Sequence, residues 1–497
     1  MHKKLLLSSI LTMFLLAACT TADPAPSQNP SNDPTAASPA LSVTATVAPS
    51  DCEGCHKDAV LNWEGGAHAN TQSAVAKQLS QMRAGQTPED VINGSNADDC
   101  IACHGPRAVA VAGIVTKETE ALDHFFNTTD GKFNSDTQSI NSTDWPQINC
   151  ATCHQVADEH SKAQLEYGIY NSKTAQFTAL DDSSKVCGQC HGSLLTASRD
   201  HQIYDAWKIS KHSDTQTGVA NVIGLAFKDW TPADVINRDG NCIACHAPTA
   251  VLANGGMTDA DATAYFYTTR DGKFSANTTV DHASEWPNVS CTACHDPHNP
   301  SIIAFFNSTT RKYEPVTDNN DLCGQCHGNK RFTNSKNLSY NIIAGSGGMN
   351  VPDQQMEPNV VCTDCHMYTS DAAGSTSAVM GGHTWAVTVR EENGMSTSSC
   401  THCHADMDAV KSDTIIRQFQ SEFKDLDTRA KSNMENAKQA MDGISNPDLQ
   451  AKLKEAQFNL AYAESDESSG YHNHTYLMTL LNDSVQRTQE ILTALGK

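Results

Sequence analysis

The sequence predicts a mainly α-helical chain with extensive loops, built from two tandem repeats and a C-terminal module that ends in long helices. Three observations carry this prediction: nine Cys-x-x-Cys-His motifs, an internal repeat of about 140 residues, and a helical spacing of apolar residues after Met407. Only 39% of the 497 residues are hydrophobic, so the chain has little apolar material for cores of its own. The net charge of −23 argues against nucleic acid and anionic lipid surfaces as partners, since both select clusters of Lys and Arg.

The N-terminus has the pattern of an export signal. Lys3 and Lys4 precede an apolar run that is too short to span a membrane, and small residues then lead to Cys19. We therefore expect residues 1–18 to be a lipoprotein signal peptide with Cys19 as the lipidated first mature residue. The alternative is an ordinary signal peptide followed by a chance cysteine. Residues 19–50, rich in Pro, Ser, Thr and Ala, are predicted to form a flexible tether.

The nine motifs are typical of covalent haem c attachment. Two thiols three residues apart on one helical turn can bind the two vinyl groups of a haem, and the next imidazole can bind its iron. A zinc or redox-dithiol site would not require His in the fifth position nine times. The motifs therefore predict a multihaem cytochrome c with nine covalent haems. Numbered 1 to 9 along the chain, the motifs are Cys52/Cys55/His56, Cys100/Cys103/His104, Cys150/Cys153/His154, Cys187/Cys190/His191, Cys242/Cys245/His246, Cys291/Cys294/His295, Cys323/Cys326/His327, Cys362/Cys365/His366 and Cys400/Cys403/His404.

Enough further histidines exist to give every iron a second, distal ligand. Two of them stand in the same Trp-x(4)-His setting, namely His68 after Trp63 and His212 after Trp207. His124 and His282 have no counterpart in the other repeat, and a surface role suits them equally well. A methionine could also bind an iron, but none has a distinctive context. The distal candidates are His68, His212, His160, His298, His383, His472, His201, His402 and His474.

The internal repeat assigns three haems to each of two units. The segment Thr87–Asn93 reappears as Thr231–Asn237, each before an identical Cys-Ile-Ala-Cys-His motif, and Asp-Gly-Lys-Phe, Trp-Pro and Cys-Gly-Gln-Cys-His-Gly follow in the same order in both copies. We therefore expect repeat 1 at 51–186 with haems 1–3, repeat 2 at 187–322 with haems 4–6, a C-terminal haem module at 323–406 with haems 7–9, and long helices at 407–497 that pack on that module.

The last third of the chain resembles pentahaem, ammonia-forming cytochrome c nitrite reductase. The residues that carry the likeness are motif 7, Val361 to Met367, Gly-His383-Thr-Trp385, Ser399 to His404, and the helical pair that leads to Glu464 and His472. The resemblance implies that His383 and His472 are distal ligands, with His474 as a rival to His472. All nine motifs here end in His, however, whereas the catalytic haem of that family is bound through Cys-x-x-Cys-Lys. The family's Glu and Tyr residues for calcium and catalysis are replaced by Gly328-Asn-Lys-Arg-Phe332.

These patterns favour an electron carrier over an enzyme. We expect a lipoprotein, facing the periplasm or the cell exterior, whose mostly bis-His haems pass electrons between redox partners such as donor and acceptor cytochromes or a quinol-oxidising membrane complex. No catalytic side chain is assigned, and self-association is a further possibility. The alternative function is reduction of nitrite, hydroxylamine or a sulfur oxyanion at one haem with an open distal side. A third hypothesis is a subunit of a polymerised cytochrome conduit.

Overall fold

The computed structural model describes part of the chain, including most of the haem motifs and all of the C-terminal helices. The described residues are 49–71, 84–87, 89–90, 103, 105–106, 128–133, 148–154, 168–171, 176–179, 183–192, 202–215, 225, 227–238, 242–255, 258–276, 288–316, 318–330, 337–356, 360–368, 382–390 and 396–497. Several predicted features lie outside these ranges: the signal peptide with Cys19, nearly all of the tether, Cys100, His104, His124, His160, His201 and His282.

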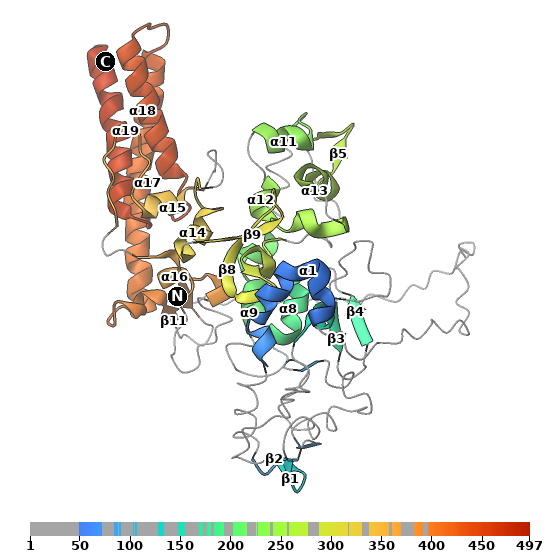
Figure 1. The fold of residues 1–497 in the computed structure, drawn as a ribbon. Coiled ribbons are helices and arrows are strands. Elements are labelled where there is room, and N and C mark those ends of the chain that lie inside the picture. The colour runs from blue at the N-terminus through green and yellow to red at the C-terminus, as the bar shows by residue number, and fades with distance from the viewer. Residues whose placement is uncertain are drawn as a thin grey trace, which may run out of the picture. The chain divides into compact units, whose positions relative to one another are not determined.

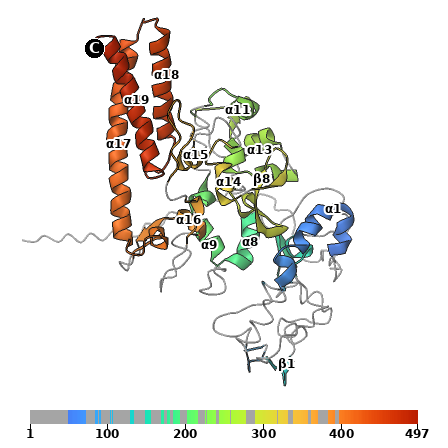
Figure 2. The ribbon, with the colours of Figure 1, turned by 60° about the vertical axis from the view of Figure 1, so that its left-hand side comes forward.

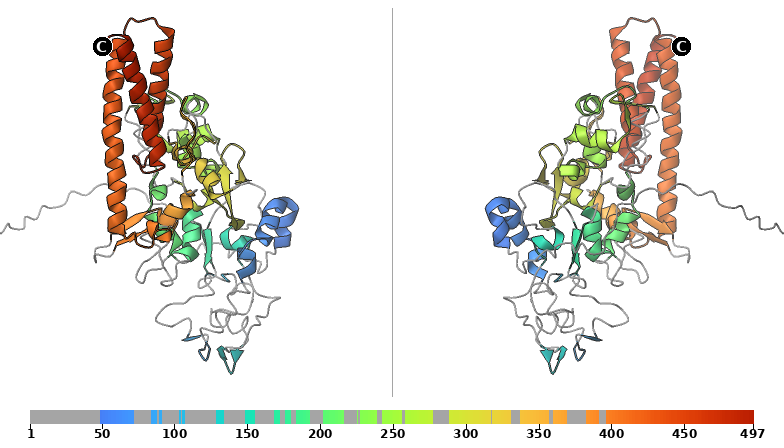
Figure 3. Two further views of the ribbon diagram at one scale, coloured as in Figure 1. Left: turned by 90° about the vertical axis from the view of Figure 1, so that its left-hand side faces the viewer. Right: turned by 90° about the vertical axis from the view of Figure 1, so that its right-hand side faces the viewer.

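The C-terminal region forms the three long helices that the apolar spacing predicts. They are α17 (Ala409–Ala440), α18 (Pro447–Glu464) and α19 (His474–Ala494), which pack side by side (Figures 1 and 3). Their shared core contains Phe423, Leu460, Leu477 and Leu480, all less than 10% exposed. The mainly helical expectation is thereby confirmed.

The starts of these three helices are set by side chains that accept otherwise unpaired backbone N–H groups. Asp408 accepts from Lys411 N at 2.8 Å, and Asn446 accepts from Leu449 N at 3.2 Å. Asn473, with φ 36°, caps α19 and also donates to the carbonyls of Ile342 and Gln354. The cap of α19 therefore also ties the segment around Ile342 to this helix.

The remaining helices are short, and most of them carry a haem motif. They are α1 (Pro49–Glu64), α7 (Cys150–Cys153), α8 (Ser183–His191), α9 (Ile203–Lys208), α11 (Pro232–Arg238), α12 (Cys242–His246), α13 (Asp259–Phe266), α14 (Asn319–Gly324), α15 (Ser339–Ile343) and α16 (Cys362–His366). The short 3₁₀ helices of the described residues are η1 (His68–Asn70), η4 (Lys211–Asp214), η5 (Ala250–Gly255), η7 (Cys291–Ala293), η8 (Gly382–Thr384) and η9 (Ser399–His402).

Small antiparallel sheets join these helices. The paired strands are β1 (Thr128–Thr129) with β2 (Lys132–Phe133), β3 (Gly168–Asn171) with β4 (Gln176–Ala179), β5 (Thr269–Arg270) with β6 (Lys273–Phe274), and β10 (Thr388–Arg390) with β11 (Ser396–Ser398). The three-stranded sheet contains β7 (His295–Asp296), β8 (Asn299–Asn307) and β9 (Lys312–Pro315), in that order. Figure 2 shows β8 near α14.

The two sequence repeats make matching contacts. The Trp63 indole donates to Ile148 O at 2.7 Å, and the Trp207 indole donates to Val289 O at 2.9 Å, in each case two residues before the repeat's third motif. Asp130 and Asp271 both have a positive φ, as do the glycines that follow them, so the same two-residue hairpin turn occurs in both copies. The repeat is therefore structural as well as sequential.

Candidate haem sites

Eight of the nine motifs have their proximal histidine among the described residues. Motif 1 lies in α1, motif 3 starts with α7, motif 4 ends α8, motif 5 forms α12 and motif 6 starts with η7. Motif 7 starts in α14, motif 8 forms α16, and motif 9 starts in η9 and ends just after it. A helical turn brings the two thiols of a motif to one side. None of the described cysteines is in a disulfide.

The motif residues are not equally enclosed by the rest of the chain. Cys55 and His56 of α1 are exposed, as is Cys403 of motif 9, whereas Cys245 on α12 and Cys326 just after α14 are half-buried. His56 also leaves the helical conformation, with φ −117° and ψ 41°, so α1 kinks at its motif. A thiol that binds the edge of a haem must point away from its own helix, so exposure at these positions is compatible with attachment. The described part of the chain does not enclose Cys55, His56 or Cys403, however. The haem-binding role of these three residues, and of Cys245 and Cys326, stays a prediction from the motif spacing.

Five proximal histidines each face one distal candidate at nearly the same distance. The ring centres lie 6.1–6.4 Å apart in every pair, and each pair joins residues that are far apart in the sequence. Two imidazoles bound to opposite sides of one iron have their ring centres about 6 Å apart, because each metal–nitrogen bond is about 2 Å long. The pairs thus fit a haem iron between the rings. They are His154–His298, His191–His68, His295–His383, His327–His212 and His366–His472.

Burial keeps three of the distal candidates in their neutral form. Burial, followed by the facing His191, lowers the pKa of His68 to about 4. Burial also lowers the pKa of His212 and of His383 to about 4, with His327 and His295 as the next largest contributions. Neutral imidazole is the form that binds a metal, so these environments suit iron ligation.

Hydrogen bonds at Nδ1 orient three of the paired histidines. His472 Nδ1 lies 2.7 Å from Oδ1 of Asp466, His298 Nδ1 lies 3.2 Å from Oδ1 of Asp296, and His366 Nδ1 lies 2.9 Å from the carbonyl of Trp385. Burial alone would raise the pKa of Asp466, but hydrogen bonds from His472, Ser468 and Ser339 lower it overall. In all three histidines the ring is held from the Nδ1 side, which leaves Nε2 for a metal.

The last two described candidates have other surroundings. Both ring nitrogens of His474 have partners, since Nδ1 lies 2.8 Å from Gly470 O and Nε2 lies 3.2 Å from Glu422, and the ring stacks on Phe419 at 4.3 Å. His402 is exposed, and its ring lies 4.6 Å from that of Tyr368. Neither is brought to face a proximal histidine.

Different motifs lie against one another in space. Among the elements that carry them, α8 contacts η7, α14 contacts α16, and α16 contacts η9. Cys153 of motif 3 is an electrostatic neighbour of Cys190 of motif 4, and Cys294 of motif 6 is an electrostatic neighbour of Cys323 of motif 7. The thiol positions of separate motifs lie next to each other in four pairs: Cys52–Cys150, Cys103–Cys190, Cys187–Cys291 and Cys323–Cys362.

Comparison with known proteins identifies the family. The profile described as cytochrome c552 matches residues 68–235 and 353–497. The chain belongs to this family. It is therefore a multihaem cytochrome that binds haem c covalently, and the predicted nitrite reductase-like resemblance is confirmed. Two shorter matches, to the doubled CXXCH motif over 287–332 and to cytochrome c554 and c-prime over 186–296, agree with this assignment.

Individual relatives of this cytochrome are distant. Multiheme cytochrome MtrA of Shewanella baltica (strain OS185) is 22% identical over 239 residues, which are 47% of this chain and 54% of the relative, so the match spans about half the length of that protein. The crystal structure of outer cell wall cytochrome OcwA has a TM-score of 0.47 at 16% identity, covering 90% of this chain and all of the other. Cytochrome c nitrite reductase (NrfA) of Desulfovibrio desulfuricans ATCC 27774 has a TM-score of 0.33 at 15% identity, covering 57% of this chain and 70% of the other.

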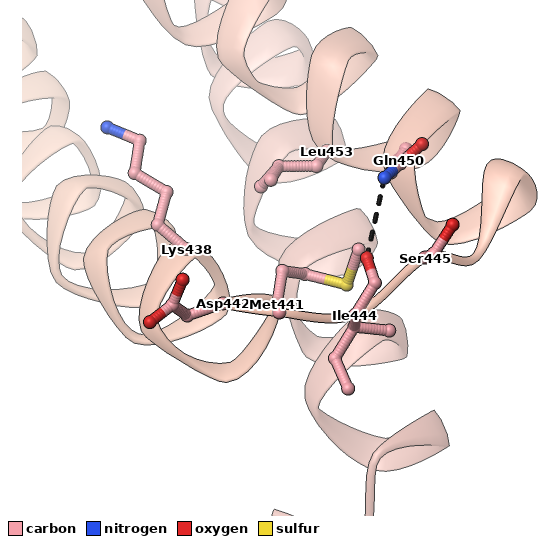
Figure 4. A pocket seen from close by; sticks show the side chains of 8 residues that line it. Lys438, Met441, Asp442, Ile444, Ser445, Gln450 and Leu453 are labelled. Atoms are coloured by element: carbon pink, nitrogen blue, oxygen red, sulfur yellow. Dashed lines mark hydrogen bonds between the residues drawn. The ribbon is translucent and has the colours of Figure 1, made fainter.

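Other features of the cytochrome are not associated with the motifs. A shallow hollow of about 430 Å³ lies at the turn between α17 and α18, and none of its lining residues belongs to a motif or is a distal candidate (Figure 4). Within the described residues, no helix is long and apolar enough to cross a membrane. Nor does this part of the chain gather three or more His, Cys, Asp or Glu side chains into a separate metal site.

Three residues of the cytochrome's haem sites had no role assigned to them from the sequence. Asp466 and Asp296 contact distal candidates, and Trp385 contacts candidate ligands of three different motifs. Asp296 stands two residues before His298, so a His with a nearby carboxylate was a visible signal there. Asp466 and Trp385 act through tertiary contacts that no local pattern indicates.

Proposed function

We propose that this cytochrome is a nine-haem electron-transfer lipoprotein whose mostly bis-His haems link redox partners in the periplasm or at the cell surface. The observation that carries the proposal is the set of five His–His pairs at 6.1–6.4 Å, each made of one motif histidine and one other histidine. When both axial positions are filled, an iron stays six-coordinate in both oxidation states, so electron transfer requires little reorganisation.

The contacts between motifs support a continuous path. Because each haem would be attached at the thiol positions of its motif, motifs whose thiol positions are neighbours would bring their haems close together. The four neighbouring thiol pairs place haem 1 beside haem 3, haem 2 beside haem 4, haem 4 beside haem 6 and haem 7 beside haem 8. The electrostatic neighbours Cys153–Cys190 and Cys294–Cys323 add the steps from 3 to 4 and from 6 to 7. We infer the order 1–3–4–6–7–8, which the contact between α16 and η9 extends to haem 9. The path therefore differs from the order along the sequence.

The finer assignments belong to the same proposal. Cys19 would carry the lipid, and the four modules would be 51–186, 187–322, 323–406 and 407–497, as the matching Trp63 and Trp207 contacts support. The acidic charge favours redox partners with basic docking surfaces. Replacing Cys19 by Ala should abolish lipid attachment, as measured by mass spectrometry of the mature protein.

One observation favours the reductase alternative at haem 9. His404 is exposed, and within the described residues no second histidine ring faces it. If the distal side of haem 9 were open, a small oxyanion could bind there.

Low-temperature EPR of the fully oxidised protein, with a haem count on the same sample, tests the proposal. Nine haems that are all low-spin are the expected result. A high-spin ferric signal that shifts when nitrite or hydroxylamine is added would overturn the purely electron-transferring function in favour of the reductase.

A further inference from the structure

Two of the five paired distal histidines hydrogen-bond a carboxylate. His472 Nδ1 lies 2.7 Å from Asp466 Oδ1, and His298 Nδ1 lies 3.2 Å from Asp296 Oδ1. An ionised carboxylate only accepts hydrogen bonds, so each imidazole donates its Nδ1–H and directs Nε2 to the other side. The facing rings on that side are His366 and His154.

Both carboxylates are held in place from separate parts of the chain. The Asp466 side chain is fully buried, and it accepts from Ser339 Oγ at 2.8 Å and from Ser468 Oγ. The Asp296 side chain is 9% exposed, and it accepts from Asn62 Nδ2 of α1 at 3.1 Å. These are fixed, desolvated charges and not mobile surface groups.

The other three distal candidates differ in this respect. Among the residues that the structure describes, His68, His212 and His383 have no carboxylate within hydrogen-bonding distance. Within the described part of the chain there are thus two kinds of distal candidate, one with a buried carboxylate at Nδ1 and one without.

The difference affects the iron. A hydrogen bond to a buried carboxylate makes an imidazole a stronger electron donor, and a nearby negative charge favours ferric over ferrous iron. We propose that Asp466 and Asp296 are positioning residues that lower the midpoint potentials of haems 8 and 3 through His472 and His298. This inference rests on the proposed bis-His ligation and deepens it.

The consequence is a defined potential profile. In the proposed order, haems 3 and 8 flank haems 4, 6 and 7, whose distal candidates have no such carboxylate among the described residues. This contribution alone places one haem of lower potential on each side of three haems of higher potential. Electrons would therefore be held mainly on haems 4, 6 and 7.

The test is a potentiometric titration followed by EPR, which resolves low-spin haems by their g values. In Asp466→Asn we expect one low-spin component to shift to a more positive potential, with changed g values and an unchanged haem count. Asp296→Asn should do the same to a different component. Glu422→Gln is the matched control, because Glu422 contacts His474, which faces no proximal histidine.

A second variant separates tuning from simple loss of structure. Ser339 donates to the same Asp466 oxygen that accepts from His472, so Ser339→Ala leaves more negative charge on that oxygen. The same component should then shift to a more negative potential, opposite to Asp466→Asn. Shifts of both variants in one direction, unchanged potentials, or conversion of haem 8 to high-spin in Asp466→Asn would each overturn the inference. The proposed function is tested independently by EPR of the unmodified protein, and a high-spin haem there would contradict it whatever the variants show.

Discussion

The carbonyl oxygen of Trp385 lies 2.9 Å from Nδ1 of His366, and the same residue places its indole ring edge-on to His212 with 4.1 Å between ring centres. His383, two residues earlier, lies 5.6 Å from the indole. Trp385 thus contacts candidate ligands of haems 8, 7 and 6. It does so with φ 55°, a left-handed backbone conformation that is uncommon for a bulky residue. The strain is tolerated because the conformation directs the carbonyl and the ring to different histidines.

We predict that Trp385→Leu disturbs haem 7 without removing it. Loss of the edge-to-face contact should lower the free energy of unfolding by about 1 kcal/mol and let the His212 ring rotate. EPR should then show changed g values for one low-spin haem at an unchanged haem count. Trp385→Phe keeps an aromatic ring there and should give a smaller change. Equal effects of Leu and Phe would contradict a role for the ring.

Removing a distal ligand should open one iron. In His212→Gly we expect one haem to become high-spin, and added imidazole should restore the low-spin signal by filling the space. His474→Gly is the control from the same list of sequence candidates, and it should leave every haem low-spin because both nitrogens of His474 already bind Gly470 and Glu422. EPR of both variants tests whether the histidines whose rings face a proximal histidine are the distal ligands.

Asn459 ties the loop at Met349 to the long helices. Its buried amide accepts from Met349 N at 2.7 Å, donates to Met349 O at 3.0 Å and donates to Asp483 at 2.7 Å. Asn459→Ala leaves the N–H and the carbonyl of Met349 without this partner, while Asp483 keeps its bond from Arg487, and the free energy of unfolding should fall by about 3 kcal/mol. Guanidinium titration followed by far-UV circular dichroism measures this loss. Gln486→Ala, which removes only the exposed bond to Glu490, should change stability by less than about 0.5 kcal/mol.

The chemistry of the haem sites follows from short sequence spacings, but the pairing of ligands does not. Motif spacing predicts where haem is bound, and the Trp-x(4)-His setting singles out His68 and His212, both of which face a proximal histidine. Which proximal histidine each one faces depends on contacts between segments far apart in the sequence, and no local pattern contains that information. His298 shows the limit, because it follows motif 6 but faces His154 of motif 3. The β7–β8 turn, held by Asp296 and by Asn62 of α1, directs its ring to that motif.

Gly470 connects the fold of the long helices to the site of haem 8. It lies between Asp466 and His472 with φ 105°, and a Cβ atom there would come within 2.3 Å of the Cβ of Phe423. No side chain can rotate to relieve a clash between two Cβ atoms, so the segment that carries His472 would have to move. Gly470→Ala should therefore lower the free energy of unfolding by more than about 2 kcal/mol and convert part of haem 8 to high-spin.

Gly443→Ala separates the cost of the left-handed backbone from the cost of the Cβ clash in Gly470→Ala. Gly443 has φ 70°, but nothing lies within 4 Å of the added Cβ, so this substitution costs only the left-handed backbone term of about 1 kcal/mol. Chemical denaturation should rank Gly470→Ala as clearly more destabilising, and EPR should show a high-spin fraction in that variant alone. If both variants lose the same stability and both stay low-spin, close packing at Gly470 does not hold His472 in place, and the position of the ligand must depend on Asp466 and the cap at Asn473.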